Sequence, residues 1–131
     1  MNAIQDKLRE LVVRHCSSLR TNSELLAGFI AEMNEPGNVS GQPARDALHL
    51  AHQIAGAGGS IGFSDVSVIA SDIEHALQPI VAVNGIPSPV QRERIAGLVS
   101  QLRTFADALT PESSTLFRVD ASALAQARRS A

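Results

Sequence analysis

The sequence contains no tryptophan and no tyrosine, and phenylalanine occurs only four times. Proteins that bind single-stranded nucleic acids usually stack the bases on exposed aromatic rings, and binding to phosphate backbones requires clustered positive charge. This chain instead has a net charge of −2 and an isoelectric point near 6.0. We therefore expect that it does not bind nucleic acid.

Long apolar runs and cysteine pairs are also missing. No apolar run reaches the roughly 18 residues needed to cross a bilayer, and residues 1–10 mix charges with Ile4 and Leu8 instead of forming a signal peptide. The only cysteine, Cys16, has no partner for an internal disulfide, which suits a reducing compartment. These absences predict a cytoplasmic protein without a membrane-spanning segment.

The sequence signatures of common enzyme classes are not found either. There is no Ser-His-Asp set, nucleophile elbow, phosphate-binding loop or dinucleotide fingerprint. The length of 131 residues and the apolar content of 44% are sufficient for one domain with a single core.

What the sequence does contain is a series of amphipathic segments, none with the period-two alternation of a strand. Predicted helices span residues 3–33, 43–59, 64–83 and 88–109, separated by turns rich in glycine and proline. Such helices favour an antiparallel four-helix bundle, so the predicted fold class is all-α. We expect residues 1–111 to form the bundle, with an N-terminal helical extension, and residues 112–131 to form a tail, either a short helix or disordered.

Three of these helices have apolar stripes that predict their buried faces. In the third helix the stripe consists of Val66, Ile69, Ala70, Ile73 and Leu77. In the first helix the stripe consists of Leu8, Val12, His15, Leu19, Asn22, Leu26, Phe29 and Met33. In the fourth it consists of Ile95, Leu98, Val99, Leu102, Phe105, Ala106 and Leu109. His15 is then predicted to be a packed core histidine. A capping box formed by Thr21 and Glu24 leaves open whether the first segment is one helix or two.

The second helix has an unusual outer face. At 100° per residue its core side is formed by Ala47, Leu50, Ala51, Ile54, Ala57, Gly58 and Ile61. His52 lies about 160° from the centre of that side, so its ring should point into solvent. An exposed helix face normally carries Lys, Glu and Arg, whereas the residues beside His52 are small.

The glycine one turn after the histidine is costly for a helix. Gly56 lies in the helix interior, where glycine is about 1 kcal/mol less favourable than alanine. It also leaves room for the backbone of another protein to approach the ring of His52. Because a histidine ring is largely neutral near pH 7, one nitrogen keeps a lone pair that can accept a phosphoryl group. The pattern therefore points to an accessible nucleophilic histidine.

At these positions the sequence resembles the histidine-phosphotransfer (HPt) domains of bacterial phosphorelays. The family has the active histidine, a glycine four residues later, small residues, and another glycine ten residues after the histidine. This chain has His52, Gly56, the small residues 57–60 and Gly62 at those places. The resemblance spans about residues 5–109.

The resemblance is most specific between residues 51 and 74, and it includes one departure. In the next helix, Asp72-Ile73-Glu74 is similar to the Leu-Glu pair of the family, with Ile73 in place of the leucine. Many members have a lysine three residues after the histidine, where it assists the phosphoryl oxygens, but this chain has Ala55. That departure bears on the rate and on the stability of the phosphohistidine.

The resemblance implies a function and a set of partners. A phosphorylated aspartate of a receiver domain, or a histidine kinase in separate or hybrid form, would donate a phosphoryl group to His52, and a response regulator would later take it. The chain would then be a phosphoryl carrier and not a turnover enzyme, without a cofactor or metal site of its own, because the receiver brings Mg²⁺. A monomer is expected. The residues predicted to form the docking patch are Leu48, His49, Gln53, Ala55, Gly56 and Gly59.

Two alternatives remain at the level of the sequence. The chain would be a pure binding module if it docked to a receiver or kinase without accepting phosphate, and Ala55 keeps this reading open. It would be the detached phosphoacceptor domain of a kinase if a separate kinase phosphorylated it in trans. A metal site at His49 and His52 has suitable spacing but needs a further ligand, so His49 is interpreted as a solvated rim residue.

Overall fold

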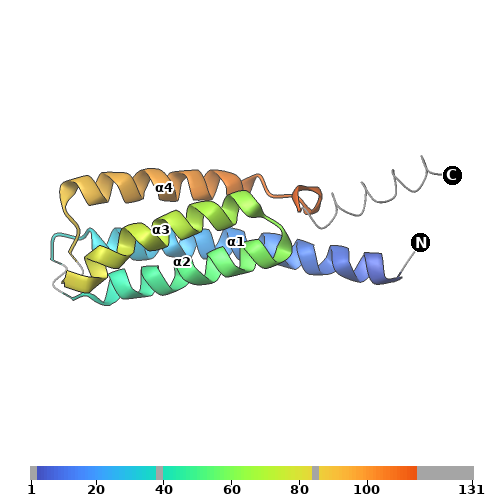
Figure 1. Ribbon diagram of the computed structural model, residues 1–131, viewed down its shortest axis with the longest axis horizontal. Helices are drawn as coiled ribbons and strands as arrows, with labels where there is room; N and C mark the ends of the chain where they lie inside the picture. The colour runs from blue at the N-terminus through green and yellow to red at the C-terminus, as the bar shows by residue number, and fades with distance from the viewer. Residues whose placement is uncertain (1–2, 38–39, 84–85, 115–131) are drawn as a thin grey trace.

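The computed structural model describes residues 3–37, 40–83 and 86–114. The helices are α1 (Ala3–Met33), α2 (Gln42–Ile61), α3 (Ser64–Val83) and α4 (Pro89–Asp107), followed by a short 3-10 helix, η1 (Pro111–Ser113). The four long helices run up and down in an elongated bundle, and the first turns of α1 project beyond the α2–α3 turn (Figure 1). The predicted all-α four-helix bundle is confirmed, including its N-terminal helical extension.

The helix α1 is continuous over 31 residues, so it is one helix and not two. Its buried residues recur at spacings of four and three: Val12, Cys16, Leu19, Ser23, Leu26, Ile30 and Met33. The predicted stripe was wrong at His15 and Asn22, which are only half buried because in each case the next residue packs into the core. Phe29 is half buried and packs against the core. Ser23 tolerates burial since its hydroxyl donates a hydrogen bond to the Arg20 carbonyl, 2.8 Å away.

The turn between α2 and α3 is very short and depends on one glycine. Gly62 has φ = 88°, in the left-handed region that side chains rarely adopt, and its N–H donates to the Gly59 carbonyl. The N–H of Phe63 donates to the Gly58 carbonyl at 2.7 Å, which completes the C-terminal capping motif of α2. The chain can therefore reverse direction at once, and α3 begins at Ser64 beside the end of α2.

The helix α3 is the most apolar of the four. Among the described residues it alone has the length and composition of a membrane-spanning helix, although the core helix of a soluble bundle passes the same test. Its buried residues form one stripe: Val66, Ile69, Ala70, Ile73, Leu77 and Ile80. Asp72 and His75 are exposed, and Pro79 lies inside the helix without ending it. The apolar stripe faces the bundle core, which accounts for the composition of α3.

The helix α4 begins where the sequence predicts. The Ser88 hydroxyl accepts a hydrogen bond from the Gln91 N–H at 3.2 Å, and the Gln91 side chain accepts one from the Ser88 N–H at 2.8 Å. This reciprocal pair is the capping box, with Pro89 in the first turn. The prediction that Phe105 is buried was wrong: it is 40% exposed, because it borders a cavity at the end of the bundle.

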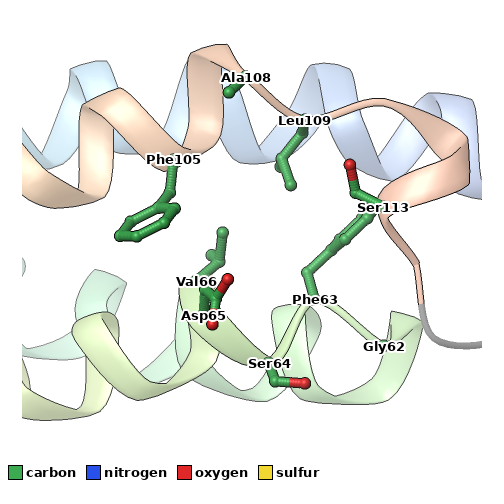
Figure 2. A pocket seen from close by; sticks show the side chains of 9 residues that line it. All are labelled: Gly62, Phe63, Ser64, Asp65, Val66, Phe105, Ala108, Leu109 and Ser113. Atoms are coloured by element: carbon green, nitrogen blue, oxygen red, sulfur yellow. The ribbon is translucent and has the colours of Figure 1, made fainter.

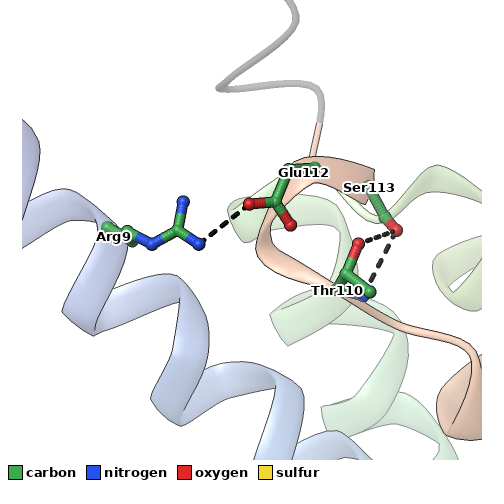
Figure 3. Close-up of polar contacts among 4 residues, drawn as sticks. All are labelled: Arg9, Thr110, Glu112 and Ser113. Atoms are coloured by element: carbon green, nitrogen blue, oxygen red, sulfur yellow. Dashed lines mark hydrogen bonds and ion pairs between the residues drawn. The ribbon is translucent and has the colours of Figure 1, made fainter.

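The chain beyond α4 stays attached to the bundle as far as Ser114. The Arg20 guanidinium donates to the carbonyls of Ala106 and Leu109, and the buried Ser114 hydroxyl donates to the Ile61 carbonyl. Glu112 forms an ion pair with Arg9 of α1, and Thr110 is hydrogen-bonded to Ser113 (Figure 3). Residues 115–131, most of the expected tail, lie outside the described residues.

Candidate functional site

The histidine singled out by the sequence lies in the middle of α2 on the side away from the core. Its side chain is 71% exposed, whereas Ala51 and Ile54 on the opposite side are buried. The facing predicted from the helical periodicity therefore agrees with the structure. A ring in this position is open to another protein.

One carboxylate of α3 contacts that ring. Oε2 of Glu74 lies 3.0 Å from Nδ1 of His52, and the Glu74 side chain is only 19% exposed. A carboxylate accepts a hydrogen bond, so Nδ1 carries the proton when the ring is neutral. The other nitrogen, Nε2, then has the free lone pair. The contact therefore holds Nδ1 and leaves Nε2 as the ring nitrogen that is open to chemistry.

Close packing of α2 against α3 makes this contact possible. A Cβ on Gly58 would lie 3.3 Å from the Ser67 backbone nitrogen and 3.3 Å from Cγ1 of Val66, so a side chain there would push the helices apart. The Ser67 hydroxyl donates to the Ala55 carbonyl at 2.8 Å. Residue 74 is two turns after residue 67, on the same side of α3. The turn and the glycine together bring Glu74 to His52.

The predicted docking residues divide into two groups. Leu48 and Ala55 are half buried and pack against the core. His49 and Gln53 are exposed and contact each other, with 3.1 Å between the Gln53 amide nitrogen and Nε2 of His49. The second pair thus lies together beside His52 on the exposed side of α2.

The two predicted docking glycines differ in their surroundings. Among the described residues, a Cβ added to Gly56 would meet no atom within 4 Å, so their packing does not require glycine there. A Cβ added to Gly59 would lie 3.3 Å from the Ser67 hydroxyl, so packing already favours a small residue there. Gly56 is therefore the better indicator of an approach from outside.

Sequence reasoning missed Glu74 as a neighbour of the histidine. In the sequence Glu74 stands out only as part of a short motif in the third helix, and it lies 22 residues after His52. The available signal was the two-residue turn at Gly62 and Phe63, which fixes the register between α2 and α3. His52 lies ten residues before Gly62 and Glu74 lies eleven residues after Phe63, so the two residues are at nearly the same height on the neighbouring helices.

The described residues offer few other sites for chemistry. They contain no group of three His, Cys, Asp or Glu side chains arranged to hold a metal ion. Burial raises the pKa of the Cys16 thiol, which disfavours the reactive thiolate. A cavity of about 190 Å³ lies between the start of α3 and the end of α4, where Val66 faces Phe105 and the Phe63 side chain points toward Leu109 and Ser113 (Figure 2). His52 does not line it.

Comparison with known protein families agrees with this geometry. The family described as Hpt domain matches residues 7–127. The chain therefore belongs to the Hpt domain family, whose members carry out histidine phosphotransfer in phosphorelays with receiver domains and kinases as partners. Searches of curated proteins and of solved structures gave no significant match.

Proposed function

We propose that this protein is a phosphoryl carrier that accepts a phosphoryl group on Nε2 of His52 from a receiver aspartate or a kinase and passes it to a response regulator. The observation that carries the proposal is the exposed His52 ring with Nδ1 3.0 Å from the Glu74 carboxylate, in a chain of the Hpt family. Nε2, the proposed acceptor atom, has its lone pair available, and Nδ1 is held by Glu74.

The transfer step follows from that arrangement. The Nε2 lone pair attacks the phosphorus of the aspartyl phosphate, and the bond from phosphorus to the carboxylate oxygen breaks with its electron pair leaving on the aspartate. The ring gains positive charge while Nδ1–H stays hydrogen-bonded to Glu74, which stabilises that charge. In the second transfer a carboxylate oxygen of the next aspartate attacks the phosphorus, and the bond from phosphorus to Nε2 breaks with its electron pair returning to the ring.

The receiver provides most of the catalysis. It brings Mg²⁺ and the acidic pocket around its aspartate, and the carrier contributes a correctly placed nucleophile. The exposed ring of His52 enters that pocket, and the open space at Gly56 admits the edge of the receiver. A carrier of this kind is not a turnover enzyme and needs no cofactor of its own. We expect it to act as a cytoplasmic monomer.

The proposal is tested by incubating the purified protein with a phosphorylated receiver domain and Mg²⁺. We expect an acid-labile, base-stable phosphate on the wild type and complete loss of the label in His52→Gln. His49→Gln is the matched control, because it is a neighbouring exposed histidine and should keep the label.

The same experiment separates the alternatives. Binding of the receiver without labelling, in a folded protein and across a broad panel of receivers, would replace the carrier with a docking inhibitor. Labelling by a kinase and ATP but by no receiver would identify a detached phosphoacceptor domain. Label retained in His52→Gln would place the acceptor elsewhere and refute the assignment.

A further inference from the structure

A small cavity lies on the side of α3 that faces away from His52. It opens between α3 and α4 and has a volume of about 180 Å³. Glu74 contacts His52, and the next residue, His75, points about 100° away around the helix and lines this cavity. The feature is named the Arg94 cavity, and its lining consists of His75, Ala76, Pro79, Gln91, Arg94 and Ile95.

The Arg94 cavity combines an apolar wall with side chains that donate hydrogen bonds. Ile95 is fully buried, whereas Arg94 and His75 are exposed. A guanidinium has five N–H donors and a permanent positive charge, and a histidine ring can donate as well. The side-chain oxygen of Gln91 accepts a hydrogen bond from the Ser88 N–H at 2.8 Å, so its amide NH₂ group can still donate. Such a set of donors favours a negatively charged occupant.

The described part of the chain does not neutralise the charge of Arg94. Neither of the two ion pairs among the described residues includes it. No Asp or Glu lines the cavity, and Asp72, which precedes His75 by three residues, is not part of the lining. The Arg94 guanidinium is therefore available to a carboxylate from another molecule.

The size and the position of the Arg94 cavity indicate what kind of group enters it. Small-molecule sites typically measure about 300–1,000 Å³, so a cavity of about 180 Å³ suits a single side chain better than a metabolite. A stable protein interface covers about 800 Å² on each partner, which is a patch roughly 30 Å across, whereas a helix is only about 10 Å wide. A receiver docked over His52 is thus wide enough to reach across α3 to the cavity.

From this we infer that the Arg94 cavity is a second contact point for the docked receiver and binds the carboxylate of one Asp or Glu side chain of that partner. This carboxylate is separate from the acidic pocket around the receiver's phosphorylated aspartate, and it pairs with the Arg94 guanidinium. The inference rests on the proposed function and adds a residue that determines which receivers bind. Receivers with a neutral or basic side chain at the matching place bind less tightly.

The test compares Arg94→Gln with Arg92→Gln, which changes an exposed arginine of α4 that does not line the cavity. The probe is a receiver domain that binds the wild-type protein, and its Kd is measured by titration calorimetry. We expect Arg94→Gln to raise the Kd about fivefold and Arg92→Gln to leave it within twofold of wild type. Where the receiver also labels His52, Arg94→Gln should raise the half-saturating receiver concentration and leave the maximal transfer rate within twofold.

Charge reversal identifies the side chain of the partner. Arg94→Glu should weaken binding more than Arg94→Gln, and a change of one receiver Asp or Glu to Lys should restore binding to Arg94→Glu but not to the wild type. A Kd of Arg94→Gln within twofold of wild type would overturn the inference. An equal loss of affinity in Arg92→Gln would also overturn it, because general charge attraction would then explain the effect.

The remaining outcomes separate this inference from the proposed function. If no receiver change restores binding to Arg94→Glu, and inorganic phosphate shifts the Arg94 side-chain NMR signal of the wild type, the cavity binds a free anion and the inference is overturned. A receiver that loses affinity for Arg94→Gln and is rescued by charge reversal, but never labels His52, would refute the carrier function and support the second contact. Absence of binding by every receiver tested would overturn both.

Discussion

Gly56 and Gly58 in α2 lie half a turn apart, and the absence of a side chain has a different reason at each position. Gly58 faces α3, and any Cβ there would press on the Ser67 backbone and on Val66. Gly56 faces outward, and a Cβ there would meet nothing within 4 Å. Packing against α3 accounts for the first glycine, whereas within the described residues no contact accounts for the second, for which we propose the approach of a partner. A glycine that is costly for a helix and has no packing reason is therefore the better candidate for a docking surface.

The largest expected effect comes from removing the contact between Glu74 of α3 and His52 of α2. This contact depends on the packing at Gly58 and lies on the same face as Gly56. We expect Glu74→Ala to lower the rate of phosphotransfer about 100-fold, because the ring loses the acceptor that orients it. Glu74→Gln keeps an acceptor oxygen and should recover part of the rate. The measurement is the single-turnover rate from a phosphorylated receiver.

A spectroscopic readout distinguishes this role from a purely structural one. In ¹⁵N NMR spectra of the wild type at a pH where the ring is neutral, we expect the proton on Nδ1 of His52, facing Glu74. In Glu74→Ala the proton should shift largely to Nε2, while the unfolding temperature changes little. A wild-type ring protonated on Nε2 would contradict the assigned orientation.

The next effect separates the two glycines by stability. We expect Gly58→Val to destabilise the fold by about 2 kcal/mol, because it overpacks the α2–α3 contact. Gly56→Ala should stabilise it by up to about 1 kcal/mol, because alanine is the better helix former and the space is open. Urea denaturation measures both values. Phosphotransfer should slow in Gly56→Ala despite the added stability, and an unchanged transfer rate there would remove the case for a docking role.

Periodicity predicted most of the fold, and its errors have a common cause. The capping box at Ser88 and Gln91 predicted the start of α4 because it depends only on residues three apart. The stripe of α1 was wrong at His15 and Asn22 because the face that packs against α2 and α4 passes through the next residues, Cys16 and Ser23. Ser23 can be buried on this face because its hydroxyl donates a hydrogen bond to a carbonyl of its own helix.

The site could be predicted only in part for a related reason. The exposure of His52 follows from its angle on one helix, so the sequence is sufficient. The contact with Glu74 depends on the register between two helices, which is fixed by the left-handed turn at Gly62. Side-chain contacts across helices need that register, and periodicity within each helix does not contain it.

The smallest expected effect lies at the end of the bundle, remote from both glycines. A hydrogen bond from its own backbone N–H, and then one from Arg9, lower the pKa of Glu112 below its usual value of 4.5. The unfolded chain therefore binds the proton more readily, so the ionised Glu112 stabilises the fold above about pH 4.5 and loses this effect as the pH falls through its lower folded value. Because the Arg9–Glu112 pair is exposed, Glu112→Gln should lower Tm by about one degree or less at pH 7. At pH 2 the same substitution should leave Tm unchanged. Glu93→Gln on α4 is the control. The phosphotransfer rate should be unaffected, because Glu112 is remote from His52. A slower rate in Glu112→Gln would show that the end of the bundle influences His52, so that a residue's effect on transfer could no longer be read from its place beside the ring, as it is for Gly56.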